Sequence, residues 1–137
     1  MANILLVNPL IRQEDKPKHI PFGLAQLASI LMKAGHRLQV FDCNAWRPTE
    51  SQIRNVLRAD KWEIIALGGL VTSYNFIKYF ASLAKQECAE AVVVLGGGVI
   101  TPIPKDIMEL IQAIDIGVIG EGYITFPELV AAIESNE

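Results

Sequence analysis

Val92-Val93-Val94-Leu95-Gly96-Gly97-Gly98 is the stretch around which the chain is organised: a short apolar run that ends in three glycines. An apolar run of this length, bounded by glycine, is typical of a strand buried on both faces of a parallel sheet. Glycines permit positive φ and let another group approach the backbone closely. Ligands of open α/β sheets bind outside the carboxyl ends of the strands. The stretch therefore predicts either a tight turn or the seat of a flat or bulky ligand.

Four further apolar runs share this character and are expected to be strands: residues 3–8, 38–41, 64–67 and 115–119. Between the runs, apolar residues recur at helical spacing, which predicts helices at about 21–34, after a cap at Thr49, after Tyr74, at about 105–112 and at about 126–133. Residues 49–52 and 125–128 each have the form of a capping box, and residues 101–104 are expected to be a non-helical connector. This alternation predicts an α/β, flavodoxin-like (Rossmann-like) three-layer sandwich. Its five-stranded parallel sheet would have the order 2-1-3-4-5, with helices on both faces.

The composition bounds the class of protein. At 137 residues the chain is expected to form a single domain, and its 51% hydrophobic and 20% charged residues are typical of a globular fold. The formal net charge is −3 and no basic run occurs, which argues against a nucleic-acid partner. No apolar stretch reaches the roughly 18 residues of a spanning helix, and no targeting segment is recognisable. We therefore expect a cytoplasmic protein with no membrane partner.

The chain has two cysteines, Cys43 and Cys88, which lie far apart in the sequence. This usage suits a reducing compartment, and both are expected to pack as small, inert apolar residues. An iron–sulfur cluster normally takes about four thiolates, so this chain by itself should not hold one.

The residues that follow the strands define the expected ligand edge of the sheet. They are Asn8-Pro9, Asp42, residues 69–74, Gly96-Gly97-Gly98 and Gly120-Glu121-Gly122. Glycines dominate this set, and it contains no cluster of acid, base and nucleophile. Such an edge favours holding a large ligand over catalysing hydrolysis.

Several familiar ligands are excluded by the same residues. A dinucleotide needs G-x-G-x-x-G after the first strand, where Asn8-Pro9 stands, and a P-loop needs Lys-Ser/Thr where Val99-Ile100 follows Gly98. A phosphoaccepting receiver needs an aspartate after the third strand, which here ends in Gly68-Gly69. The Ser/Thr-rich phosphate loop of flavodoxins is also missing after the first strand.

The ordered set of motifs resembles the N-terminal cobalamin-binding domain of cobalamin-dependent radical SAM enzymes over essentially the whole chain. The matching residues are Ile4-Leu5-Leu6-Val7-Asn8-Pro9, Pro21-Phe22-Gly23-Leu24-Ala25, Ala34-Gly35-His36, Asp42, Thr72, Val94-Leu95-Gly96-Gly97-Gly98 with Thr101 and Pro104, and Gly120-Glu121-Gly122 with Thr125 and Leu129. In that family the lower base of cobalamin is displaced from cobalt. The nucleotide tail then lies in a slot by the sheet, and the corrin rests on the loops at the strand ends.

The resemblance implies a set of cofactor-binding residues: Asn8, Pro9, Leu70, Thr72, Ser73, Tyr74, Gly96, Gly97, Gly98, Gly120, Glu121 and Gly122. Thr72 and Ser73 would hydrogen-bond the tail, and the three glycines after Leu95 would let the tail pass close to the backbone. Residues of the first loop and of the 120–122 turn would border the corrin. No catalytic residue is implied within this chain.

Some side chains keep two interpretations. Asp42 could bind a ligand hydroxyl or cap a loop, and the cap is preferred. Glu121 could face the ligand or bond the amides of its own turn, and Tyr74 could cover the corrin or pack. The motif D-x-H-x-x-G, which supplies a cobalt-ligating histidine in other cobalamin domains, is absent. His19 lies in the corresponding loop but with a different spacing to glycine, so no histidine ligand and no other metal ligand is expected.

The resemblance also implies a context. A radical SAM barrel needs three cysteines in C-x-x-x-C-x-x-C spacing, which this chain lacks, so we expect an excised N-terminal part of a longer protein. In that parent the domain would present cobalamin to a C-terminal radical SAM barrel that carries S-adenosylmethionine and a [4Fe–4S] cluster, commonly for methyl transfer. Alone, the chain should not turn over substrate. Two alternatives stay open: a stand-alone cobalamin-binding or sensory module, and the nucleotide-sugar-binding first domain of a two-domain glycosyltransferase.

Overall fold

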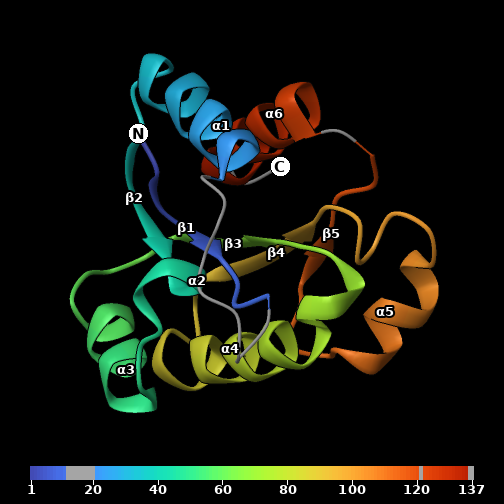
Figure 1. Ribbon diagram of the computed structural model, residues 1–137. Helices are drawn as coiled ribbons and strands as arrows, with labels where there is room; N and C mark the ends of the chain where they lie inside the picture. The colour runs from blue at the N-terminus through green and yellow to red at the C-terminus, as the bar shows by residue number, and fades with distance from the viewer. Residues whose placement is uncertain (12–20, 121, 136–137) are drawn as a thin grey trace.

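Five parallel strands in the order β2-β1-β3-β4-β5 form the centre of the computed structural model, which describes residues 1–11, 21–120 and 122–135 (Figure 1). The strands are β1 (Asn3–Asn8), β2 (Arg37–Asp42), β3 (Ile64–Gly68), β4 (Val92–Gly96) and β5 (Ile116–Gly117). The helices are α1 (Phe22–Lys33), α2 (Cys43–Trp46), α3 (Glu50–Arg58), α4 (Tyr74–Glu87), α5 (Pro104–Leu110) and α6 (Gly122–Glu134), with a short 3-10 turn η1 at Val71–Ser73. The predicted fold class and strand order are confirmed.

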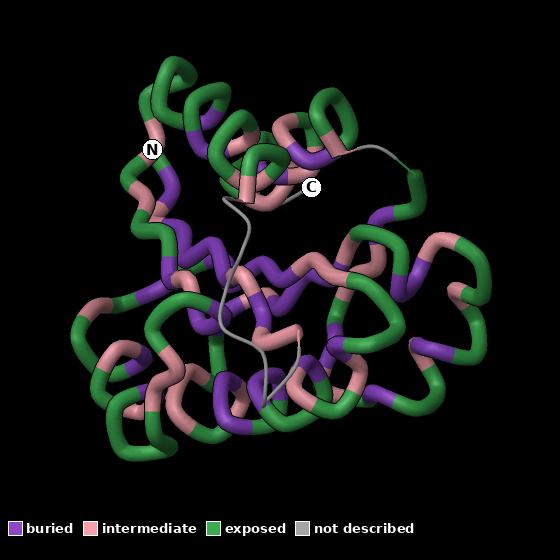
Figure 2. Tube along the Cα trace, viewed as in Figure 1, coloured by how far each residue is buried: buried purple, intermediate pink, exposed green. Residues whose placement is uncertain are grey.

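The helices divide into two layers, one on each face of the sheet (Figure 1). Alternation along β1 explains the division, because successive side chains of a strand point to opposite faces. Leu5 and Val7 belong to the core that includes residues of α3, α4 and α5, whereas Ile4 and Leu6 belong to the core under α1 and α6. All four side chains are fully buried, and buried residues fill the middle of the molecule (Figure 2).

The register brings the carboxyl ends of the strands to one edge. Asn8 pairs with Asp42, and Gly68 pairs with Gly96, so the loops that follow these four residues all begin at the same level. This edge is therefore where a ligand of such a sheet is expected.

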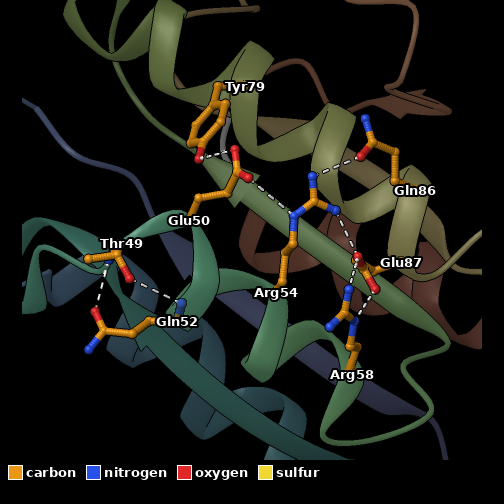
Figure 3. Close-up of polar contacts among 8 residues, drawn as sticks. All are labelled: Thr49, Glu50, Gln52, Arg54, Arg58, Tyr79, Gln86 and Glu87. Atoms are coloured by element: carbon orange, nitrogen blue, oxygen red, sulfur yellow. Dashed lines mark hydrogen bonds and ion pairs between the residues drawn. The ribbon is translucent and has the colours of Figure 1, made fainter.

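In the layer of α3, α4 and α5, ion pairs and hydrogen bonds join α3 to α4 (Figure 3). Arg54 donates to Glu87 at 2.7 Å, and Arg58 donates to both oxygens of Glu87 at 2.5 and 2.8 Å. Glu50 accepts a hydrogen bond from the Tyr79 hydroxyl at 3.2 Å. The predicted capping box at the start of α3 is confirmed, since the Thr49 side chain accepts from the Gln52 amide and Gln52 accepts from the Thr49 amide.

Several local predictions differ from the structure. The capping box predicted at residues 125–128 is wrong, because α6 begins one turn earlier, at Gly122, and contains Pro127. The earlier start brings Tyr123, as well as Phe126, against the same cavity, so tertiary packing overrides the local signal. The proline that was expected to end the 101–104 connector instead opens α5, where its missing N–H costs nothing.

The structure also adds elements to the predicted set. Two short elements, α2 after β2 and η1 after β3, were not predicted. β5 is shorter than the predicted 115–119, since only Ile116–Gly117 pair with β4. No helix among the described residues is long and apolar enough to cross a membrane.

Candidate functional site

A cavity of about 300 Å³ lies between the sheet and the layer of α1 and α6. Its lining reaches from the middle strands to the loops at their carboxyl ends. The described lining residues are Leu6, Gly23, Leu24, Leu27, Ala66, Leu67, Gly68, Val94, Gly96, Gly97, Val118, Gly120, Gly122, Tyr123 and Phe126. We call this cavity the slot. Apart from Tyr123, every one of these residues is apolar or glycine, so the slot suits an apolar ring or chain.

Small residues in the sheet create the room for the slot. Ala66 on β3 and Gly96 at the end of β4 present little or no side chain toward α1 and α6. Leu24 and Leu27, one helical turn apart on α1, form one wall, and residues of α6 form the other. The larger strand residues of this face, such as Leu6, are fully buried at the base.

The glycine turn after β4 combines both roles that its sequence predicted. Gly97 has φ of +86°, and a Cβ on it would lie 2.9 Å from the Gly69 amide nitrogen, so only glycine fits there. A Cβ on Gly98 would lie 2.9 Å from the Leu70 side chain. The tight-turn interpretation therefore accounts for Gly97, whereas the exposed Leu70 side chain could move aside for a Cβ at Gly98; Gly96 and Gly97 also line the slot.

Thr101 joins this turn to the turn after β5. Its hydroxyl donates to the Gly97 carbonyl oxygen at 3.0 Å and accepts from the Gly120 amide at 3.0 Å. Gly120 has φ of +80°, and a Cβ there would meet nothing within 4 Å. The two glycine turns are thus held at a defined separation at the mouth of the slot. Thr101 was among the matching motif residues but was not predicted as a site residue.

At the carboxyl ends of β1 and β2, polar side chains form hydrogen bonds with the protein itself. The Asn8 side-chain amide donates to Asp42 at 2.9 Å, and the same Asp42 oxygen accepts from the Ala45 amide at 3.1 Å. Asp42 is the N-cap of α2, which confirms the preferred interpretation of this aspartate as a cap. Pro9 is buried against Gly69, where a Cβ would lie 2.9 Å from the proline ring.

The predicted cofactor-binding residues fall into three groups. Gly96, Gly97, Gly120 and Gly122 share the slot. Asn8, Pro9, Leu70, Thr72, Ser73, Tyr74 and Gly98 lie at the carboxyl edge of the sheet but do not line the slot. His19 and Glu121 lie outside the described residues. Sequence reasoning missed the helical walls, whose apolar spacing also fits ordinary core residues.

Within the second group, the two hydroxyl residues differ. Thr72 is exposed, whereas Ser73 is 1% exposed and its hydroxyl has no hydrogen-bond partner among the described residues. A buried polar group without a partner is uncommon. Ser73 stands immediately before α4, in the layer opposite the slot, and Tyr74 packs against the core of that layer.

The described residues offer no obvious metal centre or nucleophile. They contain no group of three or more His, Cys, Asp or Glu that could hold a metal ion. Burial, and secondarily the charge of Asp42, raises the pKa of Cys43 to about 12, so its thiol is protonated at neutral pH. His36 lies at the opposite edge of the sheet, where its Nδ1 accepts from the Ala2 amide at 3.0 Å.

Several apolar side chains on the segments after the strands and in the first turns of α1 and α6 are exposed. They include Phe22, Trp46, Leu70, Val71, Ile119 and Ile124, each at least 58% exposed. An apolar slot at an edge of the sheet that also carries exposed apolar side chains suits a ligand with one buried part and one larger part outside.

The fold and this slot define a class: a flavodoxin-like α/β domain with a cavity at the carboxyl edge of its sheet, where ligands of such sheets bind. The model of the B12 binding domain family matches residues 10–130. The chain belongs to the B12-binding domain family, which confirms the resemblance inferred from its motifs.

Individual relatives agree with this assignment. An uncharacterized methyltransferase from Pyrococcus horikoshii is 32% identical over 116 residues, covering 85% of this chain and 25% of the relative. The anaerobic magnesium-protoporphyrin IX monomethyl ester cyclase of Synechocystis is 27% identical over 142 residues, covering 97% of this chain and 28% of the relative. The chain thus spans about a quarter of the length of these curated relatives.

Two solved structures of different kinds of protein share this fold. The radical S-adenosylmethionine methyltransferase TsrM from Kitasatospora setae, solved with cobalamin and a [4Fe–4S] cluster, superposes with a TM-score of 0.84 at 20% identity, covering 99% of this chain and 25% of that one. A response regulator from Burkholderia pseudomallei superposes with a TM-score of 0.65 at 13% identity, covering 99% of this chain and 68% of that one. Receivers therefore share the fold, and it is the glycine end of β3 that separates this chain from them.

Proposed function

We propose that this domain binds cobalamin, with the nucleotide tail in the slot and the corrin over the loops at the carboxyl edge. The observation that carries the proposal is an apolar slot at the ligand edge of the sheet, in a chain that belongs to the B12-binding domain family. Gly96, Gly97, Gly120 and Gly122 would border the tail, between Leu24 and Leu27 of α1 and Phe126 of α6.

The size and chemistry of the slot support this division of the cofactor. About 300 Å³ is at the lower end of small-molecule sites, which hold roughly 300–1,000 Å³. Such a volume suits an aromatic base and leaves the much larger corrin outside. The exposed side chains of Leu70 and Val71 after β3 and of Ile119 after β5 would then contact the corrin. Asn8, Pro9 and Thr72 stand at the same edge and belong to the proposed floor.

The cofactor is proposed to bind with its lower base displaced and without a histidine ligand. A tail held in the slot would not be available to cobalt. His36 is bonded at the amino edge of the sheet, away from the slot. In the parent protein, bound cobalamin would supply a cobalt centre able to carry a methyl group. By analogy with TsrM, we propose that this chain presents it to a radical SAM domain.

The direct test uses the purified 137-residue chain and hydroxocobalamin. After mixing and desalting, the chain should retain corrin absorbance, with the spectrum of a displaced base. Gly96→Val should lose this absorbance, because a Cβ at Gly96 meets only ordinary contacts at 3.8 Å and the added methyls would enter the slot. Gly35→Asn is the matched control at the opposite edge of the sheet; its φ of +92° strains any side chain, so circular dichroism should first show that this variant has a native fold. An absence of retained absorbance from the unaltered chain would reject the proposal.

A second variant tests whether a histidine coordinates cobalt. His19→Ala should leave the spectrum of the bound cofactor unchanged. A change in the spectrum on this substitution would show that a histidine reaches cobalt, and it would overturn the ligand-free part of the proposal while leaving cobalamin binding in place.

A further inference from the structure

Tyr123 is the one polar side chain among the described residues that line the slot. All its described neighbours in the lining are glycines or the aliphatic and aromatic side chains of Leu, Ala, Val and Phe. A ligand that enters the slot can therefore find at most one side-chain hydrogen bond from the described lining. The phenolic hydroxyl can serve as donor or acceptor.

The Tyr123 hydroxyl also lies at a defined place, beside the first turn of α1. A Cβ built on Gly23 would lie 3.5 Å from the Tyr123 oxygen, so the hydroxyl comes close to the α1 backbone where that residue has no side chain. Gly23 is the second residue of α1 and Tyr123 is the second residue of α6. The first turns of two helices thus bring the hydroxyl and a side-chain-free position together at the slot.

This hydroxyl is free to bond a ligand. Among the described residues it has no hydrogen-bond partner, and Tyr123 is 39% exposed, so water satisfies it in the free chain. By contrast, the Tyr79 hydroxyl on the opposite layer donates to Glu50 at 3.2 Å. A ligand can replace the water at Tyr123 without breaking any bond within the protein.

We propose that Tyr123 is the residue that recognises the lower base of the nucleotide tail, by donating a hydrogen bond to the ring nitrogen that cobalt releases. This inference rests on the proposed function. A ring nitrogen moved from water into an apolar slot is costly unless a donor meets it. The rest of the described lining offers no side-chain partner. The slot should therefore prefer a benzimidazole base, which has one such nitrogen, over adenine, whose extra ring nitrogens and amino group would be left unpaired.

The test compares three corrinoids on the unaltered chain and on Tyr123→Phe. These are hydroxocobalamin, the adenine-containing cobamide and cobinamide, which lacks the nucleotide. Tyr123→Phe should weaken cobalamin binding by about 2- to 10-fold, the range of one hydrogen bond, and leave cobinamide binding unchanged. The unaltered chain should bind the adenine-containing cobamide about 10-fold or more weakly than cobalamin. Dissociation constants come from absorbance titration.

Tyr79→Phe is the matched control, because it removes a phenolic hydroxyl from the other layer. It should change no dissociation constant, and circular dichroism should give both variants native folds. If the unaltered chain binds cobalamin more tightly than cobinamide but Tyr123→Phe binds cobalamin equally well, the role of Tyr123 is rejected and the proposed function stands. If the adenine-containing cobamide binds as tightly as cobalamin, the base preference is rejected. If the unaltered chain binds no corrinoid, the proposed function fails and this inference with it.

Discussion

The two faces of the sheet are built for different purposes. The face under α3, α4 and α5 is closed by a large apolar cluster, in which Phe80 packs edge-on against Phe41 and tilted against Phe76. Arg54, Arg58 and Glu87 join its helices at the surface. The face under α1 and α6 has a smaller cluster and encloses the slot.

The difference suggests that one face of the sheet contributes most of the packing, whereas the other face gives up packing to form the slot. Atoms that line an empty apolar space lose the dispersion contacts that they would make in a filled core. The slot therefore lowers the free energy of unfolding of the domain. Ala81 on the closed face is fully buried and does not line the slot. Substitutions that add volume should therefore have opposite signs on the two faces.

Ala66 and Ala81 provide the sharpest form of this comparison. Ala66→Val adds two methyl groups toward the slot and should leave the free energy of unfolding equal or up to about 1 kcal/mol higher. Ala81→Val adds the same volume to the fully buried closed face and should lower it by about 1–3 kcal/mol. Urea denaturation of both variants, read by circular dichroism, measures the two values.

Ala66→Val and Ala81→Val should also differ in their effect on cobalamin binding. Ala66→Val should abolish the preference for cobalamin over cobinamide, since it narrows the slot, and Ala81→Val should keep that preference. Equal destabilisation by both valines would mean that the slot has no usable space, and the comparison of the faces would fail.

The strands and their order could be predicted from the sequence because short apolar runs alternate with segments of helical spacing. Residues 92–96 were recognised in this way, and so was the alternation that demands parallel crossovers. The start of α6 could not be predicted, because the capping pattern at Thr125 is a local signal. Packing of Tyr123 and Phe126 on the slot decides the boundary instead.

The site was predictable only in part for a similar reason. Glycines after strands point to the ligand edge, so Gly96 and Gly120 were found. Leu24, Leu27 and Tyr123 follow the spacing of any core helix, and nothing in the sequence says that their face is left unfilled. Thr72 and Ser73 follow Gly69 at the same edge but do not line the slot, so the tail contact expected of their hydroxyls stays a prediction.

Ser73 offers a smaller test of which face a residue serves. Its buried hydroxyl has no described partner and makes no cap bond to α4, so Ser73→Ala should raise the free energy of unfolding by about 1 kcal/mol. Because Ser73 does not line the slot, cobalamin affinity should stay within about twofold. The exposed Ser82→Ala in the interior of α4 is the control: it should leave the affinity unchanged and raise the free energy of unfolding by no more than about 0.5 kcal/mol, the gain in helix propensity. A large loss of affinity in Ser73→Ala alone would instead support the tail contact that the sequence predicted for this hydroxyl.

The smallest expected effect lies on the closed face and depends on pH. Hydrogen bonds from Arg58 and then Arg54 lower the pKa of Glu87 from 4.5 to about 2. A carboxyl whose pKa is lower in the folded chain adds stability that is fully present above its unfolded pKa. That stability is lost as the pH falls through the folded pKa.

The contribution of Glu87 should therefore be constant above about pH 4.5 and disappear between about pH 4.5 and 2. In that window the unfolding midpoint of the unaltered chain should fall more steeply than that of Glu87→Gln, measured by thermal denaturation at each pH. Glu90→Gln removes an exposed carboxylate that has no ion pair among the described residues, and it should follow the unaltered chain. If the unfolding midpoints of Glu87→Gln and the unaltered chain fall in parallel with pH, the ion pairs between α3 and α4 add no stability. The closed face would then owe its stability to its apolar core alone.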